Sequence, residues 1–224
     1  MDVQALIEEA DEALAEGDLK TAERAGEALL AARHIYGFEV LTRMHQQRGD
    51  LAKALATIED GVSKAPRAWP LRLLQGELHS DNGEYDAALA AYDSVLAIDG
   101  ADVDAVHINA AIVLHRAGRY EEALARLDRA PGESDETLFA AARIRADILN
   151  ILERPDDAMA AAEKGLALVT DDVPTSDVAD LYAAMAKSAL MKGDRDEALR
   201  RAKEAVALDD NEIARLIVRE IQGR

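Results

Sequence analysis

A short phrase recurs six times along this chain of 224 residues at an almost constant interval. It consists of a glycine, usually an acidic residue, a bulky or apolar residue, two further residues and an alanine, as in the copy from Gly83 to Ala88. The closing alanines lie 32, 34, 35, 35 and 40 residues apart, by subtraction of their positions in the sequence. A period of this length is typical of repeat arrays, in which each unit packs against its neighbours.

Each phrase lies between two amphipathic stretches of helical spacing, which predicts a pair of helices joined by a tight turn. The glycine adopts the left-handed conformation that ends the first helix, and the acid meets the positive end of the second helix. The alanine keeps the second helix thin where it crosses its partner. The predicted pairs form an array over residues 1–208, with approximate repeats at 2–32, 34–64, 67–98, 102–130, 134–169 and 176–208.

Three features modify this pattern towards the C-terminus. Pro155 replaces the bulky residue in the fifth copy, at the first turn of a helix, where proline is tolerated. Ser176 is a candidate N-cap for the sixth pair. Residues 209–224 are predicted to form a capping helix, because Ile213, Leu216, Ile217 and Ile221 share one face; a docking helix for a partner is the alternative.

The composition favours helices and an acidic surface. Hydrophobic residues make up 49% of the chain, many of them alanine, and aromatic residues only 4%. This predicts an all-helical protein. The net charge of −18 argues against binding to nucleic acid and to anionic membrane surfaces. The acidity either keeps the surface solvated or favours a basic partner.

The sequence contains no cysteine, which excludes disulfides, thiol nucleophiles and thiolate metal sites. No stretch approaches the apolar run that a membrane span needs. The first residues lack the basic and apolar regions of a signal peptide, so a cytoplasmic protein is expected.

In the residues of its repeated unit, the chain resembles the tetratricopeptide repeat (TPR) family, whose pattern combines small and aromatic positions on two helices. The third copy carries this pattern best, and five of its positions are Gly76, Gly83, Tyr85, Ala88 and Tyr92. The resemblance covers nearly the whole chain. It implies an all-α, right-handed α-solenoid of six repeats, with the first helices lining a concave groove.

No catalytic, metal or cofactor site is expected. His45, His79 and His107 stand where the repeat places aromatic residues, so packing with a satisfied ring nitrogen explains them better than metal ligation. His107 and His115 are eight residues apart and are not joined by a nearby acid. Acids at helix starts and on exposed faces account for the paired carboxylates. The chain is therefore predicted not to be an enzyme.

What remains is the groove that the resemblance implies. Its arginines and asparagines are suited to hold the carbonyls or a carboxylate of an extended peptide, although the same residues equally suit a solvated, salt-bridged surface. A second candidate surface is Trp69, for which burial against the preceding helix is the favoured interpretation. The predicted groove residues are Arg43, Gln47, Glu77, Asn109, Ile112, His115, Arg116, Arg143, Asn150 and Lys187.

The leading functional prediction is a non-catalytic scaffold or adaptor that binds a protein or peptide segment in the groove. The alternative is a structural protein that assembles with copies of itself, and the expected state is a monomer or a weak homo-oligomer.

Overall fold

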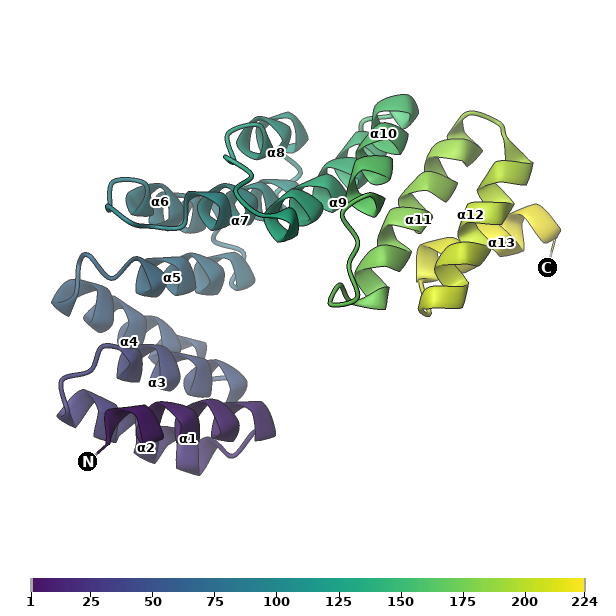
Figure 1. Ribbon diagram of the computed structural model, residues 1–224. Coiled ribbons are helices and arrows are strands. Elements are labelled where there is room, and N and C mark those ends of the chain that lie inside the picture. Colours follow the sequence, from purple (N-terminus) through teal and green to yellow (C-terminus); the bar gives the residue numbers. More distant parts are fainter. Residues whose placement is uncertain (1, 224) are drawn as a thin grey trace. The chain divides into compact units, whose positions relative to one another are not determined.

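The computed structural model describes residues 2–223, and this part of the chain contains thirteen α-helices and no strand. The prediction of an all-helical protein is therefore confirmed. The helices form two compact units, Met1–Val106 and His107–Arg224, each of which is described by itself (Figure 1). Within residues 2–223, no helix is both long and apolar enough to cross a membrane.

The first unit is a stack in which each helix contacts the next one in the chain. Helix α1 also contacts α3, and α3 contacts α5, so the first helices of successive pairs are neighbours. Figure 1 shows these helices layered on one another in chain order. The six helices are α1 (Val3–Glu16), α2 (Leu19–Ala31), α3 (Tyr36–Gln47), α4 (Leu51–Lys64), α5 (Trp69–Asp81) and α6 (Tyr85–Val95).

The second unit repeats this arrangement from α9 onwards. Successive helices are in contact, and α11 contacts both α9 and α13. Helix α7 begins just before the boundary between the units. The helices are α7 (Val103–Arg116), α8 (Tyr120–Leu127), α9 (Asp135–Ile151), α10 (Pro155–Leu166), α11 (Thr175–Met191), α12 (Arg195–Leu208) and α13 (Glu212–Gln222).

The first copy of the repeated phrase shows how its residues build the turn. Gly17 has a φ of 74°, the left-handed conformation that glycine adopts without a steric penalty. The Asp18 carboxylate accepts hydrogen bonds from the backbone N–H groups of Lys20 and Thr21, both at 3.2 Å, and so caps α2. Ala22 is fully buried. The predicted roles of glycine, acid and alanine are confirmed here.

Close helix packing depends on small residues in the cores. The clearest case is Gly76 on α5, which faces the ring of Tyr92 on α6. A Cβ atom at Gly76 would lie 2.3 Å from Cε1 of Tyr92, and only 2% of Tyr92 is exposed. The two helices can approach this closely only because position 76 has no side chain.

The fifth copy lacks the glycine, and its turn is strained as a result. Glu153 takes the left-handed position with a φ of 56°, and Pro155 is the first residue of α10, as predicted. For a residue with a Cβ atom this conformation costs about 1–2 kcal/mol.

We expect Glu153→Gly to raise the free energy of unfolding by about 1 kcal/mol, because relief of this strain outweighs the larger chain entropy of glycine. Urea unfolding followed by circular dichroism measures the change. Glu133→Gly, in the exposed segment before α9, is the control, since its φ is not positive. Equal effects of the two substitutions would contradict this account.

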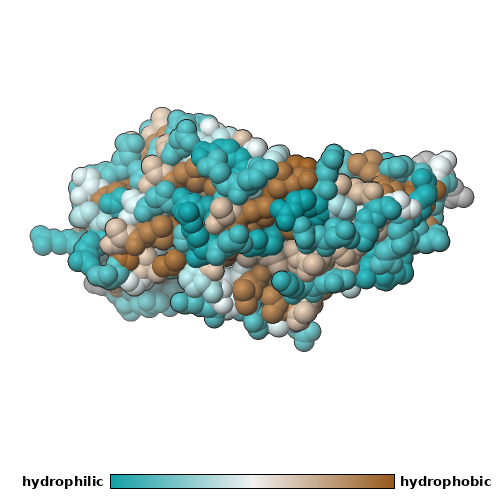
Figure 2. Space-filling model, turned by 90° about the horizontal axis from the view of Figure 1, so that it is seen from above, coloured by the Kyte–Doolittle hydropathy of each residue, from teal (hydrophilic) through white to brown (hydrophobic). Residues whose placement is uncertain are grey.

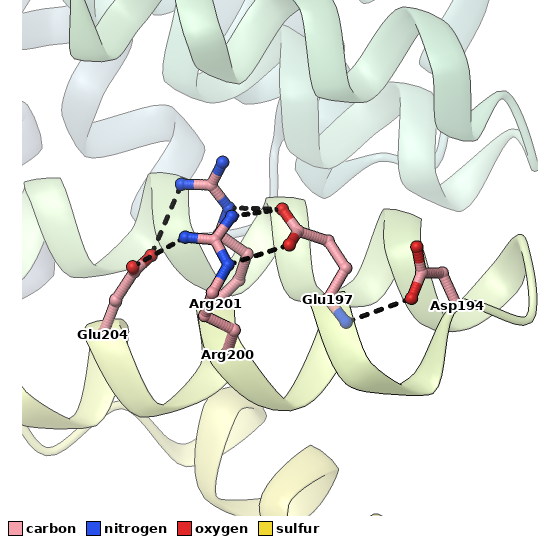
Figure 3. Close-up of polar contacts among 5 residues, drawn as sticks. All are labelled: Asp194, Glu197, Arg200, Arg201 and Glu204. Carbon is pink, nitrogen blue, oxygen red and sulfur yellow. Dashed lines mark hydrogen bonds and ion pairs between the residues drawn. The ribbon is translucent and has the colours of Figure 1, made fainter.

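Polar side chains on α12 form a network along its surface (Figure 3). Arg200 and Arg201 each contact both Glu197 and Glu204, one turn away in either direction. Hydrogen bonds from Arg200, and then from Arg201, lower the pKa of Glu197. The backbone N–H of Glu197 in turn donates to the Asp194 carboxylate, which caps the helix. Each exposed pair contributes little stability individually, but the side chains of Arg201 and Glu197 are only 20% and 28% exposed, and the four charges act as one network.

Several predicted boundaries were wrong. Helix α11 begins at Thr175 after Pro174, and no side chain caps it, so Ser176 is its second residue and not its N-cap. Helix α8 ends at Leu127 and not at residue 130, because the residue before a proline, here Ala130, disfavours the helical conformation. Helix α6 ends at Val95, three residues before the end of the approximate repeat at residue 98.

The predicted apolar face of the last helix is only partly buried. On α13, Ala214 and Ile217 are buried, and Val218 and Ile221 pack against the same core. In contrast, Ile213 and Leu216 are 47% and 55% exposed. Figure 2 shows one face of the molecule, on which small groups of hydrophobic residues, in brown, are surrounded by hydrophilic residues, in teal.

Candidate binding site

A cavity of about 350 Å³ lies in the second unit, on the face formed by α7, α9, α11 and α13. On α9 and α11 its residues recur at spacings of three and four, which places them on one face of each helix. Four of the predicted groove residues, Ile112, His115, Arg143 and Lys187, lie together here. The other residues that line the cavity are Ile144, Asp147, Asp180, Ala183, Ala184 and Ile213.

Arg143 and Asp180 form the polar link between α9 and α11. Nη1 of Arg143 lies 3.2 Å from Oδ2 of Asp180. The side-chain amide of Asn211, the N-cap of α13, donates to Oδ1 of Asp180 at 2.9 Å. Burial raises the pKa of Asp180, and the charge of Arg143 opposes this shift. Nε of Arg143 is buried and has no hydrogen-bond partner among the described residues.

His115 on α7 lies beside an acid from the next first helix. Its Nε2 is 3.0 Å from Oδ2 of Asp147, although the geometry is not that of a hydrogen bond, so the contact is an ion pair only when the imidazole is protonated. The sequence did not reveal this acid, because Asp147 belongs to another helix. Residues 2–223 contain no group of three or more candidate metal ligands.

Lys187 differs from the other charged residues of the cavity. It is half-buried on α11, and no hydrogen bond or ion pair joins its ammonium group to another described residue. The side chains of Ile112 and Ile144 are half-buried, and Ile213 on α13 is exposed. The cavity therefore combines an apolar wall with a cation that has no partner among residues 2–223.

Asn150 is not exposed, contrary to the prediction. Only 2% of it is accessible, and it joins α9 to α11. Its Nδ2 donates to the carbonyl of Ala184, and its Oδ1 accepts from Oγ of Ser188, both at 2.8 Å. Asn150 is thus a packing residue. Asn109 and Arg116 lie on α7, half-buried and exposed respectively, and neither lines the cavity.

The remaining predicted groove residues, Arg43, Gln47 and Glu77, lie in the first unit and contact α1, α3 and α5. Nε of Arg43 donates to Glu39 at 3.0 Å, and its Nη1 lies 3.9 Å from Glu77. The amide of Gln47 donates to the carbonyl of Leu14 at 3.1 Å. Burial raises the pKa of Glu77, against the charge of Arg43. Arg43 and Glu77 thus take part in ion pairs of the first unit, and neither they nor Gln47 line the cavity.

The residues for which packing was the favoured interpretation are His45, His79, His107 and Trp69. Nδ1 of His79 lies 2.6 Å from Glu84, so its ring nitrogen is satisfied as predicted. Nδ1 of His45 is buried without a hydrogen-bond partner, which contradicts that prediction, and burial lowers its pKa. His107 is buried. Trp69, the first residue of α5, is half-buried.

The sequence analysis missed a second concave region, a trough of about 860 Å³ bounded by α8, α9 and α10. It is open because α8 has only eight residues, whereas α10 has twelve. Leu138 of α9, 42% exposed, lies in it. The signal was present in Pro131 and Gly132, which predict an early end for α8.

Comparisons with known proteins agree with the helical repeats. The sequence matches the tetratricopeptide repeat family at residues 43–103 and 79–148. A comparison with curated proteins found no match.

Solved structures with the same fold share little sequence with the chain. PilW, a type IV pilus biogenesis factor, has a TM-score of 0.77 at 18% identity, over 96% of this chain and 98% of PilW. The Pseudomonas aeruginosa pilF protein has a TM-score of 0.74 at 15% identity, over 99% and 96% of the two chains. YrrB has a TM-score of 0.58 at 17% identity, over 87% and 96%. At these identities the similarity shows the fold alone.

Proposed function

Because this chain is a tetratricopeptide repeat protein, we propose that it is a non-catalytic scaffold that binds a segment of a partner protein on its first helices. The observation that carries this proposal is the cavity on α7, α9, α11 and α13. It presents apolar walls together with Lys187, a cation that no described residue neutralises.

The proposed mechanism is preorganisation. Two of the helices that carry the cavity residues, α9 and α11, are already joined to each other. Asn150 bonds to the carbonyl of Ala184, and Arg143 contacts Asp180. Binding then orders few side chains of the scaffold, and the flexible segment of the partner loses most of the conformational entropy. YrrB, described as a TPR protein with an unusual peptide-binding site, supports the general class of function.

A photo-crosslinking experiment tests the proposal. A benzophenone amino acid is placed at Ala184, which lines the cavity, and for comparison at Lys203, which is exposed on α12. After irradiation in the native cell, we expect discrete adducts at position 184 that are absent at position 203. The adducts are identified by mass spectrometry.

The proposal fails if position 184 gives no adduct, or if both positions give the same adducts. Excess purified protein without the photoreactive group should compete for the partner and weaken the adduct at position 184. A nonspecific surface reaction would not be reduced in this way.

Self-assembly is a second candidate, and the exposure of Leu216 and Ile213 on α13 is the observation that favours it. Two exposed apolar side chains on a terminal helix are suited to pack against the same two side chains of a second copy.

For this candidate, we expect the average mass from light scattering to rise with protein concentration, and Leu216→Glu to hold it at the monomer mass. Val169→Glu is the control, because Val169 is also exposed (38%) but follows α10 and is not on α13. A wild-type protein that stays monomeric at every concentration would exclude self-assembly through α13.

A further inference from the structure

The cavity on α7, α9, α11 and α13 contains two hydrogen-bond donor groups that have no acceptor among the described residues. Nε of Arg143 is a buried donor without an acceptor, and the ammonium of Lys187 has no partner among the described residues. Nε of Arg143 has almost no accessible surface, so the donor that a ligand in the cavity can reach is the ammonium of Lys187.

The two carboxylates of the cavity each lie beside a nitrogen-bearing side chain of the protein. Asp180 contacts Arg143 and accepts from Asn211, and Asp147 lies beside His115. In a chain of net charge −18, the group left without a partner is thus a cation. This charge complementarity favours an anionic group on the ligand.

On α11, the apolar residues Ala183 and Ala184 line the cavity on the N-terminal side of Lys187. Ala183 precedes Lys187 by four residues on α11, which is a rise of about 6 Å along the helix. In an extended segment, side chains two residues apart point to the same face and are about 6.6 Å apart. An apolar side chain against the wall and an acidic side chain two residues away therefore match this spacing.

We propose that the cavity binds an extended segment with an apolar residue, any residue and then an acidic residue, whose carboxylate contacts Lys187. This inference rests on the proposed function and names the chemistry of its ligand. The carboxylate belongs to an acidic side chain and not to the C-terminus of the segment. A C-terminal apolar residue carries its carboxylate on its own backbone, which is closer to its side chain than the spacing between Ala183 and Lys187 requires. A volume of about 350 Å³ suits one apolar side chain and its neighbour.

The probes are capped tripeptides with the sequences Leu-Ala-Glu, Leu-Ala-Gln and Leu-Glu-Ala, together with N-acetyl-leucine. Binding is followed by NMR through the δ1 methyl groups of Ile112, Ile144 and Ile213. Ligands of this size are expected to bind with Kd values on the order of millimolar. At low ionic strength we expect Leu-Ala-Glu to bind roughly fivefold more tightly than either of the other tripeptides, because a charge-assisted hydrogen bond is stronger than a neutral one.

Variants at Lys187 identify the contact. We expect Lys187→Gln to abolish the preference for Leu-Ala-Glu, and Lys187→Arg to retain it. Lys203→Gln removes the same charge from the exposed surface of α12 and should leave the preference unchanged. Equal binding of the tripeptides to the wild type would overturn the proposal, as would tighter binding of N-acetyl-leucine or a preference that survives Lys187→Gln.

Failure of this inference is distinguishable from failure of the proposed function. If the tripeptides shift none of the three isoleucine methyl groups while position 184 still crosslinks a partner in the cell, the ligand chemistry is wrong and the binding face stands. If crosslinking fails as well, the proposed function is wrong.

Discussion

Asn150→Asp is expected to lower the free energy of unfolding at pH 7 by about 3–5 kcal/mol, the usual cost of leaving a buried charge unpaired. The substitution keeps the shape of the side chain. However, it replaces the amide that donates to the carbonyl of Ala184 by an ionised oxygen, and only 2% of Asn150 is exposed. The hydroxyl of Ser188 can still donate to the other oxygen.

The loss should depend on pH with a definite sign. Burial raises the pKa of the introduced carboxyl in the folded state above its unfolded value of about 4. The folded state therefore binds the proton more tightly, so the loss of stability is small below about pH 4 and grows as pH rises towards the folded-state pKa. Above that pKa the loss is complete.

Urea unfolding at several pH values, followed by circular dichroism, measures this difference between variant and wild type. Asn109→Asp is the matched control, because Asn109 lies on α7 and is only half-buried, so its effect should stay within about 0.5 kcal/mol. A loss at Asn150 that is equal at pH 4 and pH 7 would show that a buried charge is not its cause.

Gly76→Val is expected to lower the free energy of unfolding of the first unit by about 3 kcal/mol, the upper part of the range for overpacked cores. The new Cβ would lie 2.3 Å from Cε1 and 2.7 Å from Cζ of Tyr92. The ring cannot move aside into solvent, because Tyr92 is buried between helices. Helices α5 and α6 must therefore separate.

Fluorescence of Trp69 reports this unfolding, because it is the one tryptophan of the sequence and begins α5. Ala52→Val, on the exposed surface of α4, controls for the helix propensity of valine. The double variant Gly76→Val/Tyr92→Leu should be more stable than the sum of the two single effects predicts, since the smaller side chain relieves the clash. Additive effects would contradict a clash between these residues.

Local chemistry explains why the helices were predictable from the sequence. The Gly17–Asp18 turn depends only on residues within a few positions of one another. The same holds for the start of α10 at Pro155. Such features are visible in the sequence because backbone conformation and capping are set by neighbouring residues.

The candidate site was less predictable because its contacts join different helices. Asn150 follows Asp147 by three residues on α9, a rotation of about 60° around the helix axis, and this turns it from the cavity into the interface with α11. Arg143 and Asp180 are 37 residues apart in the chain, and their pairing depends on how α9 packs against α11. Periodicity identifies a face of a helix but not its neighbours.

The helices contact only helices that are near them in the chain, and this affects the rate of folding. Within each unit, every contacting pair of described helices is separated by no more than one other helix in the chain. The chain therefore closes only short loops as it folds, and the entropic cost of each closure is small. Folding can start at any pair of adjacent helices and spread in both directions, at the high rates typical of proteins with low contact order.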